Sequence, residues 1–216
     1  MVPMTIPGLP TSIVLVTTRT DAPDTSAWPA ELAVVDGLPE PRRAEYITVR
    51  DCARQALARL GVPPVAILGD PKGAPIWPDG IVGSLTHCRG FRGAAVARAG
   101  DVTVLGIDAE PEESLPPGIG QRIATDAEWS RIELLTRQDA SVPWDHLLFS
   151  AKESVYKAWF PTTRVGLDFL AVDITLQTDG RGELVFLCPL PAEVAQLDWH
   201  LAWEAQDGIL ATAVWA

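Results

Sequence analysis

Residues 147–160 present two separate apolar faces when they are drawn as a helix, and this pattern limits where the segment can lie in a fold. The two faces consist of Leu147, Ala151, Val155 and Ala158, and of Phe149, Tyr156 and Phe160. A helix with two apolar faces packs on both sides, so we expect this one in the interior. Glu153 and Lys157 lie beside the second face. They form either an exposed ion pair along the helix or a reactive pair at an interior wall, where a charge needs a partner or a ligand.

The order of the remaining segments predicts an α+β fold of two similar halves, each a helical part followed by antiparallel strands. Helices are expected at 41–61, with Gly61 as the C-cap, and at 124–135 and 146–160. Strands are expected in the apolar run near the N-terminus, in part of 64–80, and at 81–87, 94–99, 102–110, 169–177, 183–187, 199–205 and 209–216. The Pro-rich residues 28–41 are expected to be irregular. The halves, 1–104 and 105–216, would meet near residues 104–110.

Charge and cysteine content restrict the classes of function. The formal net charge of −11 argues against non-specific binding to nucleic acid or to an anionic membrane, but it allows a local basic pocket. Three widely spaced cysteines without a CxxC motif indicate reduced thiols in a cytosolic protein and offer no zinc site. The N-terminal apolar run is too short for a signal peptide or a membrane span.

Two carboxylates stand at the end of a predicted strand. Asp108 and Glu110 in GIDAEP are two residues apart, so their side chains point to the same side. Two such carboxylates repel each other unless a cation lies between them, and their oxygen atoms suit magnesium. The alternative is a strand that runs into an acidic loop, because Glu112 and Glu113 follow.

A second polar cluster lies in GSLTHCRGF, at the end of another predicted strand. Ser84 and His87 could contact a phosphate there, together with the nearby arginines, or His87 could be structural. Cys88 is adjacent to His87 and would point to the opposite face, so the two do not form a nucleophilic dyad. We expect Cys88 to be a buried small residue.

Basic residues also gather around the start of the first long helix. Arg42, Arg43 and Arg50 lie in or near its first turns, and Lys72 lies in a Gly/Pro-rich turn. Helix N-termini with arginines attract anions, so these residues form either an anion site or a solvated basic face.

Three signatures in this order resemble the 4′-phosphopantetheinyl transferases of the surfactin-synthase and enterobactin type. They are VGSLTHCRGF at 82–91, LGIDAEP at 105–111 and FSAKESVYKAWFP at 149–161. The RRAEY helix and the KGAPIWPDG turn also resemble that family, so the resemblance extends from about Arg42 to Phe160. It implies two pseudo-symmetric halves, each a small antiparallel sheet packed with a long helix, and an active site at the seam between them.

The resemblance also implies roles for single residues. Asp108 and Glu110 correspond to metal ligands, and Glu153 corresponds to a third carboxylate that is also a candidate base. Lys157 corresponds to the catalytic lysine, and Lys152 to a lysine that contacts a phosphate of coenzyme A. The other implied coenzyme A contacts are Arg42, Arg50, Lys72, Ser84 and His87.

The implied reaction uses Mg²⁺ and moves the phosphopantetheine arm of coenzyme A to a serine of an acyl or peptidyl carrier protein, releasing 3′,5′-ADP. Such carriers belong to fatty acid, polyketide and non-ribosomal peptide synthases, which connects the chain with secondary metabolism. We expect a cytosolic monomer that docks its carrier through loop 114–120 and the helix near 129–135. The alternatives are a non-catalytic regulator that binds coenzyme A or a nucleotide, a metal-dependent phosphohydrolase, and an acidic interaction domain.

Overall fold

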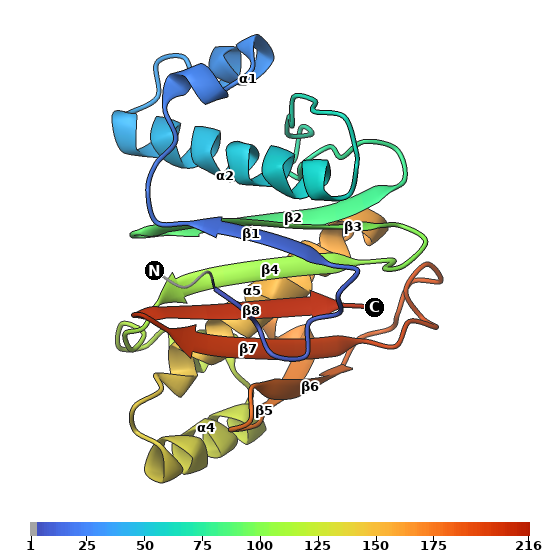
Figure 1. The fold of residues 1–216 in the computed structure, drawn as a ribbon. Coiled ribbons are helices and arrows are strands. Elements are labelled where there is room, and N and C mark those ends of the chain that lie inside the picture. Colours follow the sequence, from blue (N-terminus) through green and yellow to red (C-terminus); the bar gives the residue numbers. More distant parts are fainter. Residues whose placement is uncertain (1–3) are drawn as a thin grey trace.

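A computed structural model describes residues 4–216 as an α+β fold with two antiparallel sheets (Figure 1). The first sheet has the strand order β1-β3-β2 and the second has the order β4-β8-β7-β6-β5. The strands are β1 (Val14–Thr18), β2 (Ile81–Cys88), β3 (Phe91–Arg98), β4 (Leu105–Pro111), β5 (Val172–Leu176), β6 (Arg181–Phe186), β7 (His200–Gln206) and β8 (Ile209–Trp215). The strands of the first sheet thus all precede those of the second in the chain.

One long helix accompanies each sheet. Helix α2 (Glu40–Arg59) packs on the first sheet, and α5 (Trp144–Thr163) packs on β4 and β8 of the second (Figure 1). The shorter helices are α1 (Pro29–Val34), α3 (Gly120–Ile123) and α4 (Asp126–Gln138), and two 3₁₀ turns lie at Asp24–Ser26 and Phe169–Ala171. Among residues 4–216, no helix has the length and hydropathy that a membrane span requires.

Three apolar clusters fill the spaces between these layers. One lies between α2 and the first sheet, a second joins the two sheets with the N-terminal segment, and a third lies between the second sheet and α4 and α5. The third cluster includes Leu147, Ala151, Val155 and Ala158, which is the first apolar face expected for this helix. Phe160 of the second face belongs to a separate buried cluster with Trp159 and Val194.

The two sheets meet where β2 runs beside β4. One edge of β4 pairs with β8, with Asp108 opposite Thr212. On its other edge, the backbone N–H of Ile107 donates to Ser84 Oγ at 3.0 Å, and that of Ala109 donates to Thr86 Oγ1 at 2.8 Å. These side-chain hydroxyls of β2 satisfy buried backbone donors that would otherwise be unpaired. They join the sheets without merging them into one ladder.

Gly106 allows α5 to approach β4 closely. A Cβ atom at this position would lie 2.0 Å from the carbonyl oxygen of Ser154 and 2.6 Å from the backbone nitrogen of Ala158. Because both of these atoms belong to the helix backbone, no side-chain rotation could make room. The glycine of the GIDAE signature is therefore required by packing, which places Asp108 directly beneath the helix.

The expected fold class is confirmed, and most expected elements are present. Helix α2 ends as expected, with Gly61 at a φ of 71°, and the apolar run near the N-terminus forms β1. The strand expected within 64–80 is wrong: this stretch contains only an isolated bridge between Gly69 and Pro75. Five prolines in 63–78 remove donors that a strand ladder needs.

Other segments also differ from expectation: the strands expected at 94–99 and 102–110 are β3 at Phe91–Arg98 and β4 at Leu105–Pro111. The segment 28–41, expected to be irregular, contains α1, which begins with Pro29 in the first turn, where proline is well tolerated. The strand expected from Phe169 begins at Val172, because the Asp168 side chain caps a 3₁₀ turn at Phe169–Ala171. The division of the chain at residue 104 into two pseudo-symmetric halves stays a prediction, and residues 1–3 of the first half lie outside the described chain.

Replacing Gly106 by alanine is expected to lower the free energy of unfolding, because the new methyl group meets the backbone of α5. We expect a loss of about 3 kcal/mol, or a fall in melting temperature of about 10 °C. The matched control is Gly100→Ala, where a Cβ atom meets nothing within 4 Å. Thermal unfolding of both variants checks this, and equal melting temperatures would contradict the packing account.

Candidate active site

The Asp108 carboxylate lies at the point where β4 and α5 meet. It is only 5% exposed, and its Oδ1 atom lies 2.7 Å from Lys157 Nζ. Its Oδ2 atom accepts a hydrogen bond of 2.8 Å from Ser150 Oγ. Residues that are 49 positions apart in the sequence are thus in direct contact, and the pairing offsets part of the cost of burying both charges.

Lys157 pairs with Asp108 on β4 instead of with Glu153 on its own helix. The Lys157 side chain is 29% exposed and lies at the edge of the interior. The interpretation of Glu153 and Lys157 as a simple surface pair is therefore wrong. Besides its two apolar faces, the sequence of α5 holds a signal for a polar side that meets β4. Polar side chains recur at spacings of four, three and four residues along one side of the helix. They are His146, Ser150, Glu153 and Lys157.

Burial raises the pKa of the Glu153 carboxyl group, and the negative charges of Asp108 and Glu110 raise it further. The Lys157 ammonium acts in the opposite direction without cancelling the effect. Glu153 lies on the same side of α5 as Ser150 and Lys157, which both contact Asp108.

His146 in the first turns of α5 contacts the same group. Its Nδ1 atom lies 2.6 Å from the carbonyl oxygen of Glu113, and its Nε2 atom lies 3.6 Å from the Glu110 carboxylate. Burial lowers the pKa of His146, but the Glu110 carboxylate and the Glu113 carbonyl outweigh that effect, so the net shift is upward. His146 was not among the residues predicted from the sequence, although it belongs to the polar stripe of α5.

The three carboxylates suit magnesium in their chemistry, although they do not form a complete ligand set. Within residues 4–216, no three His, Cys, Asp or Glu side chains form a group that could hold a metal ion. Asp108, Glu110 and Glu153 supply the oxygen atoms that Mg²⁺ prefers, and a cation would relieve the repulsion that raises the pKa of Glu153. Magnesium commonly takes only one or two carboxylates and completes its shell with water and substrate phosphates. The residues present therefore fit a magnesium ion that is shared with a phosphorylated ligand.

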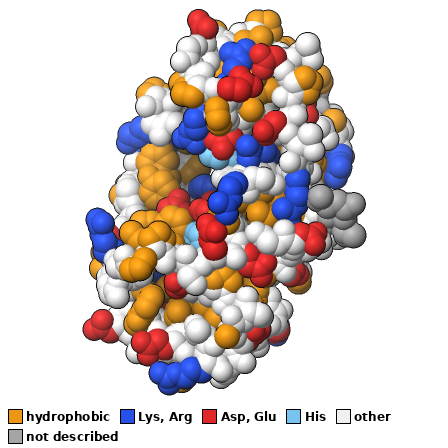
Figure 2. Space-filling view, turned by 90° about the vertical axis from the view of Figure 1, so that its left-hand side faces the viewer, with side chains coloured by type: hydrophobic (Ala, Val, Ile, Leu, Met, Phe, Trp, Pro, Cys, Tyr) orange, Lys and Arg blue, Asp and Glu red, His pale blue; other side chains and the backbone are white. Residues whose placement is uncertain are grey.

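Beside Asp108, a cavity of about 370 Å³ lies between β2, the turn after Gly69, and α5. Figure 2 shows a hollow on the face it presents, where side chains of both charges and histidine gather between apolar areas. Four of the predicted coenzyme A contacts line the cavity, together with Lys157: they are Arg50, Lys72, Ser84 and His87. This cavity brings together the LTHC and KGAP segments with the SAKESVYK helix.

Arg50 is held rigidly at the cavity wall. Its Nε atom donates to the carbonyl oxygen of Ile67 at 2.8 Å, and its Nη1 atom donates to that of Tyr46 at 3.1 Å. The guanidinium also stacks on the Tyr46 ring. Burial lowers the pKa of Arg50 from its ordinary value. The Ser84 hydroxyl, which accepts from Ile107, likewise serves both the seam and the cavity wall.

Arg42 is placed differently from the other predicted contacts. Its side chain is 66% exposed and pairs at 3.1 Å with Glu45, and it does not line the cavity. The same Glu45 carboxylate lies 3.6 Å from His87 Nδ1, so it connects Arg42 to the cavity rim. Burial lowers the pKa of His87; Glu45 opposes this, whereas Arg42 and Lys157 reinforce it.

Lys152 does not reach this cavity. Its ammonium group is buried on another side of α5 and lies 2.9 Å from the Glu128 carboxylate. It also donates to the carbonyl oxygens of Phe169 at 2.6 Å and of Val172 at 2.9 Å, so all three of its donors are used. Glu128 further accepts from the backbone N–H of Ile174. This placement argues against the predicted contact between Lys152 and a phosphate.

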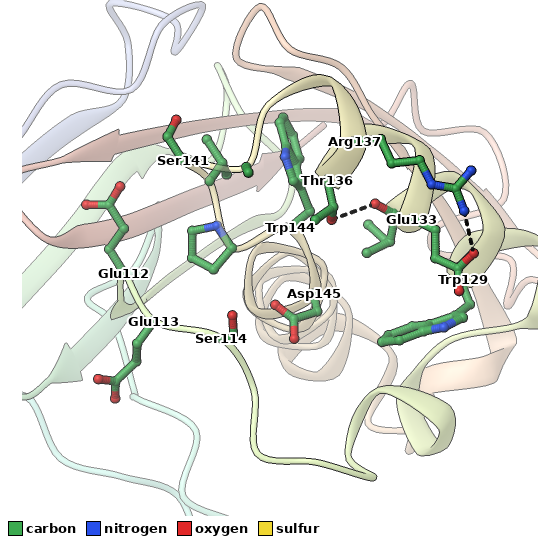
Figure 3. Close-up of a pocket in the computed structure, with 14 residues that line it drawn as sticks. Glu112, Glu113, Ser114, Trp129, Glu133, Thr136, Arg137, Ser141, Trp144 and Asp145 are labelled. Atoms are coloured by element: carbon green, nitrogen blue, oxygen red, sulfur yellow. Dashed lines mark hydrogen bonds and ion pairs between the residues drawn. The ribbon is translucent and has the colours of Figure 1, made fainter.

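Two more cavities lie along α5. One of about 210 Å³ is lined by Lys152, Glu153, Tyr156, Leu167, Asp168, Phe169 and Val172. The other, of about 590 Å³, lies between Glu112–Ser114, α4 and the start of α5. Figure 3 shows Glu112 and Glu113 on one side of it and Trp129 and Glu133 on the other. Part of the predicted docking surface, including Ser114 and Trp129, thus lines this groove.

Both parts of the chain match families of known proteins. The family "4'-phosphopantetheinyl transferase N-terminal domain" matches residues 29–97. The family "4'-phosphopantetheinyl transferase superfamily" matches residues 104–213. The second match includes the carboxylates and α5, and the first includes Arg50, Lys72, Ser84 and His87.

Individual relatives span most of the chain. It is 46% identical over 201 residues to 4'-phosphopantetheinyl transferase Svp of Streptomyces mobaraensis, covering 90% of this chain and 82% of the relative. It is 49% identical over 162 residues to 4'-phosphopantetheinyl transferase PptT of Mycobacterium tuberculosis, covering 75% and 70%. It is 36% identical over 180 residues to enterobactin synthase component D of Salmonella typhimurium, covering 80% and 71%.

A solved structure of holo-[acyl-carrier-protein] synthase from Thermotoga maritima aligns with a TM-score of 0.41 and 24% identity. The alignment covers 53% of this chain and 62% of that one. This likeness is too distant to support a conclusion about the site.

Replacing Lys152 by methionine is expected to reduce stability without weakening the binding of coenzyme A. The substitution leaves two carbonyl oxygens and the buried Glu128 carboxylate without their cation, which costs about 3 kcal/mol. The matched control is Lys72→Met, which removes a lysine that lines the cavity and should raise the Kd for coenzyme A with little change in melting temperature. Calorimetric binding and thermal unfolding check both variants. Weaker binding in Lys152→Met at an unchanged melting temperature would restore the phosphate contact that the sequence predicted.

Proposed function

The chain belongs to the 4′-phosphopantetheinyl transferase superfamily, and we propose that the seam between β2, β4 and α5 is the site at which it works. The enzyme transfers the phosphopantetheine arm of coenzyme A to a carrier-protein domain. The observation that carries the proposed site is the contact between Asp108 and Lys157. It joins a group of carboxylates to a cavity with basic walls, which is the combination that a pyrophosphate and its metal ion require.

The cavity of about 370 Å³ would hold the nucleotide half of coenzyme A. Arg50 and Lys72 supply positive charge for its phosphates, and Ser84 and His87 supply hydrogen-bonding groups. Arg42 would act from the rim, where Glu45 already links it to His87. Lys152 has no place in this proposal, because its ammonium group is committed to Glu128.

The reaction forms one bond and breaks another at a single phosphorus atom. The carrier serine oxygen bonds to the phosphorus that bears the pantetheine arm, while the bond from that phosphorus to the bridging oxygen breaks and 3′,5′-ADP leaves. The serine proton passes to Glu153 or to a water molecule that Glu153 orients. The raised pKa of Glu153 makes it a stronger base than an ordinary glutamate.

Lys157 is suited to stabilise the departing 3′,5′-ADP. Its ammonium group lines the cavity, and among residues 4–216 its only hydrogen bond is to Asp108, so its other donors can reach the leaving oxygen. Asp108 holds the lysine in this position, and Ser150 holds Asp108 from the other side. Asp108 thus has a positioning role in addition to its proposed role as a ligand.

One or two of the carboxylates of Asp108, Glu110 and Glu153 would hold a magnesium ion together with water and the substrate phosphates. When bound, the ion would neutralise part of the charge on the pyrophosphate during transfer. His146 would orient the Glu110 carboxylate, as the polar partners of metal ligands commonly do.

The carrier domain would approach along the groove between Glu112–Ser114 and α4, because Glu113, which lines the groove, and Glu110 both contact His146. Its acidic side chains, which include Glu112, Glu113 and Glu133, would repel an acidic carrier. Docking would therefore rest on apolar contacts in the groove such as Trp129 and Val142. We further propose that the protein is a cytosolic monomer that modifies synthases of secondary metabolism and binds neither nucleic acid nor membranes.

The test is incubation with coenzyme A, Mg²⁺ and a panel of apo carrier proteins, followed by intact-mass analysis. One carrier should gain the mass of the phosphopantetheine arm, and 3′,5′-ADP should appear in equal amount. Glu153→Gln and Lys157→Met are expected to reduce kcat on the order of 100-fold or more. Glu183→Gln, which changes an exposed glutamate on β6, is the matched control with full activity.

Three outcomes would contradict this assignment. Full activity of Glu153→Gln or Lys157→Met would remove their catalytic roles. Release of 3′,5′-ADP without a carrier would indicate a phosphohydrolase. Binding of coenzyme A without transfer to any carrier would indicate a regulator.

The loss of activity in Glu153→Gln must not arise from misfolding, and pH provides a check. Because burial raises the pKa of Glu153, the folded state binds its proton more tightly than the unfolded state. Stability from this group is therefore present at low pH and is lost as pH rises above about 4, the unfolded value. Without divalent cations, Glu153→Gln should thus melt at a higher temperature than the wild type at neutral pH but not at pH 4. A lower melting temperature at neutral pH would argue for a structural role.

Removal of metal ions is expected to stop transfer, and added magnesium is expected to restore it. Glu110→Gln should raise the magnesium concentration that gives half of the maximal rate, because it removes one anionic ligand. Titration of the chelated enzyme with MgCl₂ measures this. Transfer that continues unchanged in excess chelator, or an unchanged magnesium titration in Glu110→Gln, would refute the ligand role.

A further inference from the structure

The turn that carries Lys72 is organised around a single side chain, that of Asp70. Asp70 Oδ1 accepts hydrogen bonds from the backbone N–H groups of Lys72 at 2.8 Å and of Ala74 at 2.9 Å. An isolated antiparallel bridge between Gly69 and Pro75 closes the base of the turn. A side chain that bonds the backbone two and four residues ahead fixes the path of the turn. Asp70 therefore determines where Lys72 emerges.

The second carboxylate oxygen of Asp70 is bound by Arg164, a residue that is distant in the sequence. Arg164 Nη1 forms an ion pair with Asp70 Oδ2 across 94 positions of sequence. Arg164 is the C-cap of α5 and has a φ of 59°, in the left-handed region that normally favours glycine. An arginine in this conformation is strained, and the strain is tolerated where another contact offsets it. The pair with Asp70 is such a contact.

Phe160 connects the turn and the helix end to the cavity. Lys72 Nζ lies 5.4 Å and Arg164 Cζ lies 5.9 Å from the centre of the Phe160 ring. The ring itself stacks on Tyr156 at 5.5 Å. Lys72, Tyr156 and Phe160 all line the cavity of about 370 Å³, whereas Arg164 lies outside it. The cavity wall opposite β2 thus consists of Lys72, Tyr156 and Phe160, and Arg164 contacts Phe160 from outside the cavity.

We propose that Asp70 and Arg164 form a latch that holds the Lys72 turn against α5 and sets the affinity of the cavity for coenzyme A. The β2–β4 seam fixes one side of the cavity. The latch fixes the other side, where no strand pairing among residues 4–216 joins the two parts of the chain. Arg164 is a positioning residue, because it acts through Asp70 and Phe160. Among the described residues, Arg164 contacts none of Asp108, Glu153 and Lys157. Loosening the latch therefore changes the binding of coenzyme A and leaves the chemical step intact.

This inference rests on the assignment of the cavity to coenzyme A, and the experiment tests the two separately. Arg164→Gly is the main variant, because glycine keeps the left-handed conformation and only the side chain is lost. Its KM and Kd for coenzyme A are expected to rise about fivefold, with kcat unchanged and the melting temperature not lowered. Arg164→Lys, which keeps a cation, should recover part of the affinity.

Asp70→Asn provides a second test of the pair. It keeps an oxygen that can accept from Lys72 and Ala74 but removes the ionic contact with Arg164. The double variant with Arg164→Gly should raise KM no further than either single variant, since both break the same interaction. Arg181→Ala is the matched control: it removes an exposed arginine that pairs with Asp179 outside the cavity, and it should leave KM unchanged.

The outcomes separate the latch from the cavity. If Lys72→Met raises KM for coenzyme A but Arg164→Gly and Asp70→Asn do not, the latch is overturned and the cavity assignment stands. If Lys72→Met also leaves KM and Kd unchanged, the cavity assignment itself fails, and the latch fails with it. A fall in kcat as large as the rise in KM in Arg164→Gly, or additive effects in the double variant, would also overturn the latch.

Discussion

The open edge of β4 is the constraint on which the rest of the molecule depends. The backbone donors of Ile107 and Ala109 are buried, and the hydroxyls of Ser84 and Thr86 accept from them. A regular strand pairing there would have fused the two sheets into one and closed the space beside β2. Hydroxyl acceptors satisfy the same donors, yet they leave β2 free to line a cavity. The site exists because two sheets meet without merging.

The alternation of side chains along β4 then distributes packing and chemistry. Leu105, Ile107 and Ala109 point into the cluster between the sheets, so the residues between them face α5. Gly106 provides the close approach to the helix, and Asp108 meets its polar stripe. A single strand therefore anchors the core with one face and presents the reactive carboxylate with the other.

Sequence patterns predicted the parts of the site that depend on local periodicity. The two apolar faces of α5 and the shared side of Asp108 and Glu110 follow from 3.6- and 2-residue repeats. The partner of Lys157 does not, because it depends on how closely α5 approaches β4. The position of Lys152 was equally unpredictable: Glu128, its partner, has the sequence appearance of an exposed helix residue and is completely buried. Glu31, buried against Arg54, is a similar case in the first half of the chain.

The two lysines of the SAKESVYK signature show how one helix can serve stability and chemistry together. They are five residues apart, so they point to different sides of α5. Lys152 meets a carboxylate and two carbonyls that use every donor, which makes it part of the framework. Lys157 meets one carboxylate at a cavity wall and retains donors for a ligand. The residue type alone does not distinguish these two roles. The number of acceptors that already bind each ammonium group does. The chain has 28 acidic and 17 basic side chains, so at least 11 carboxylates have no lysine or arginine to neutralise them. A lysine that keeps free donors in such a chain is therefore positioned for an anion that comes from outside.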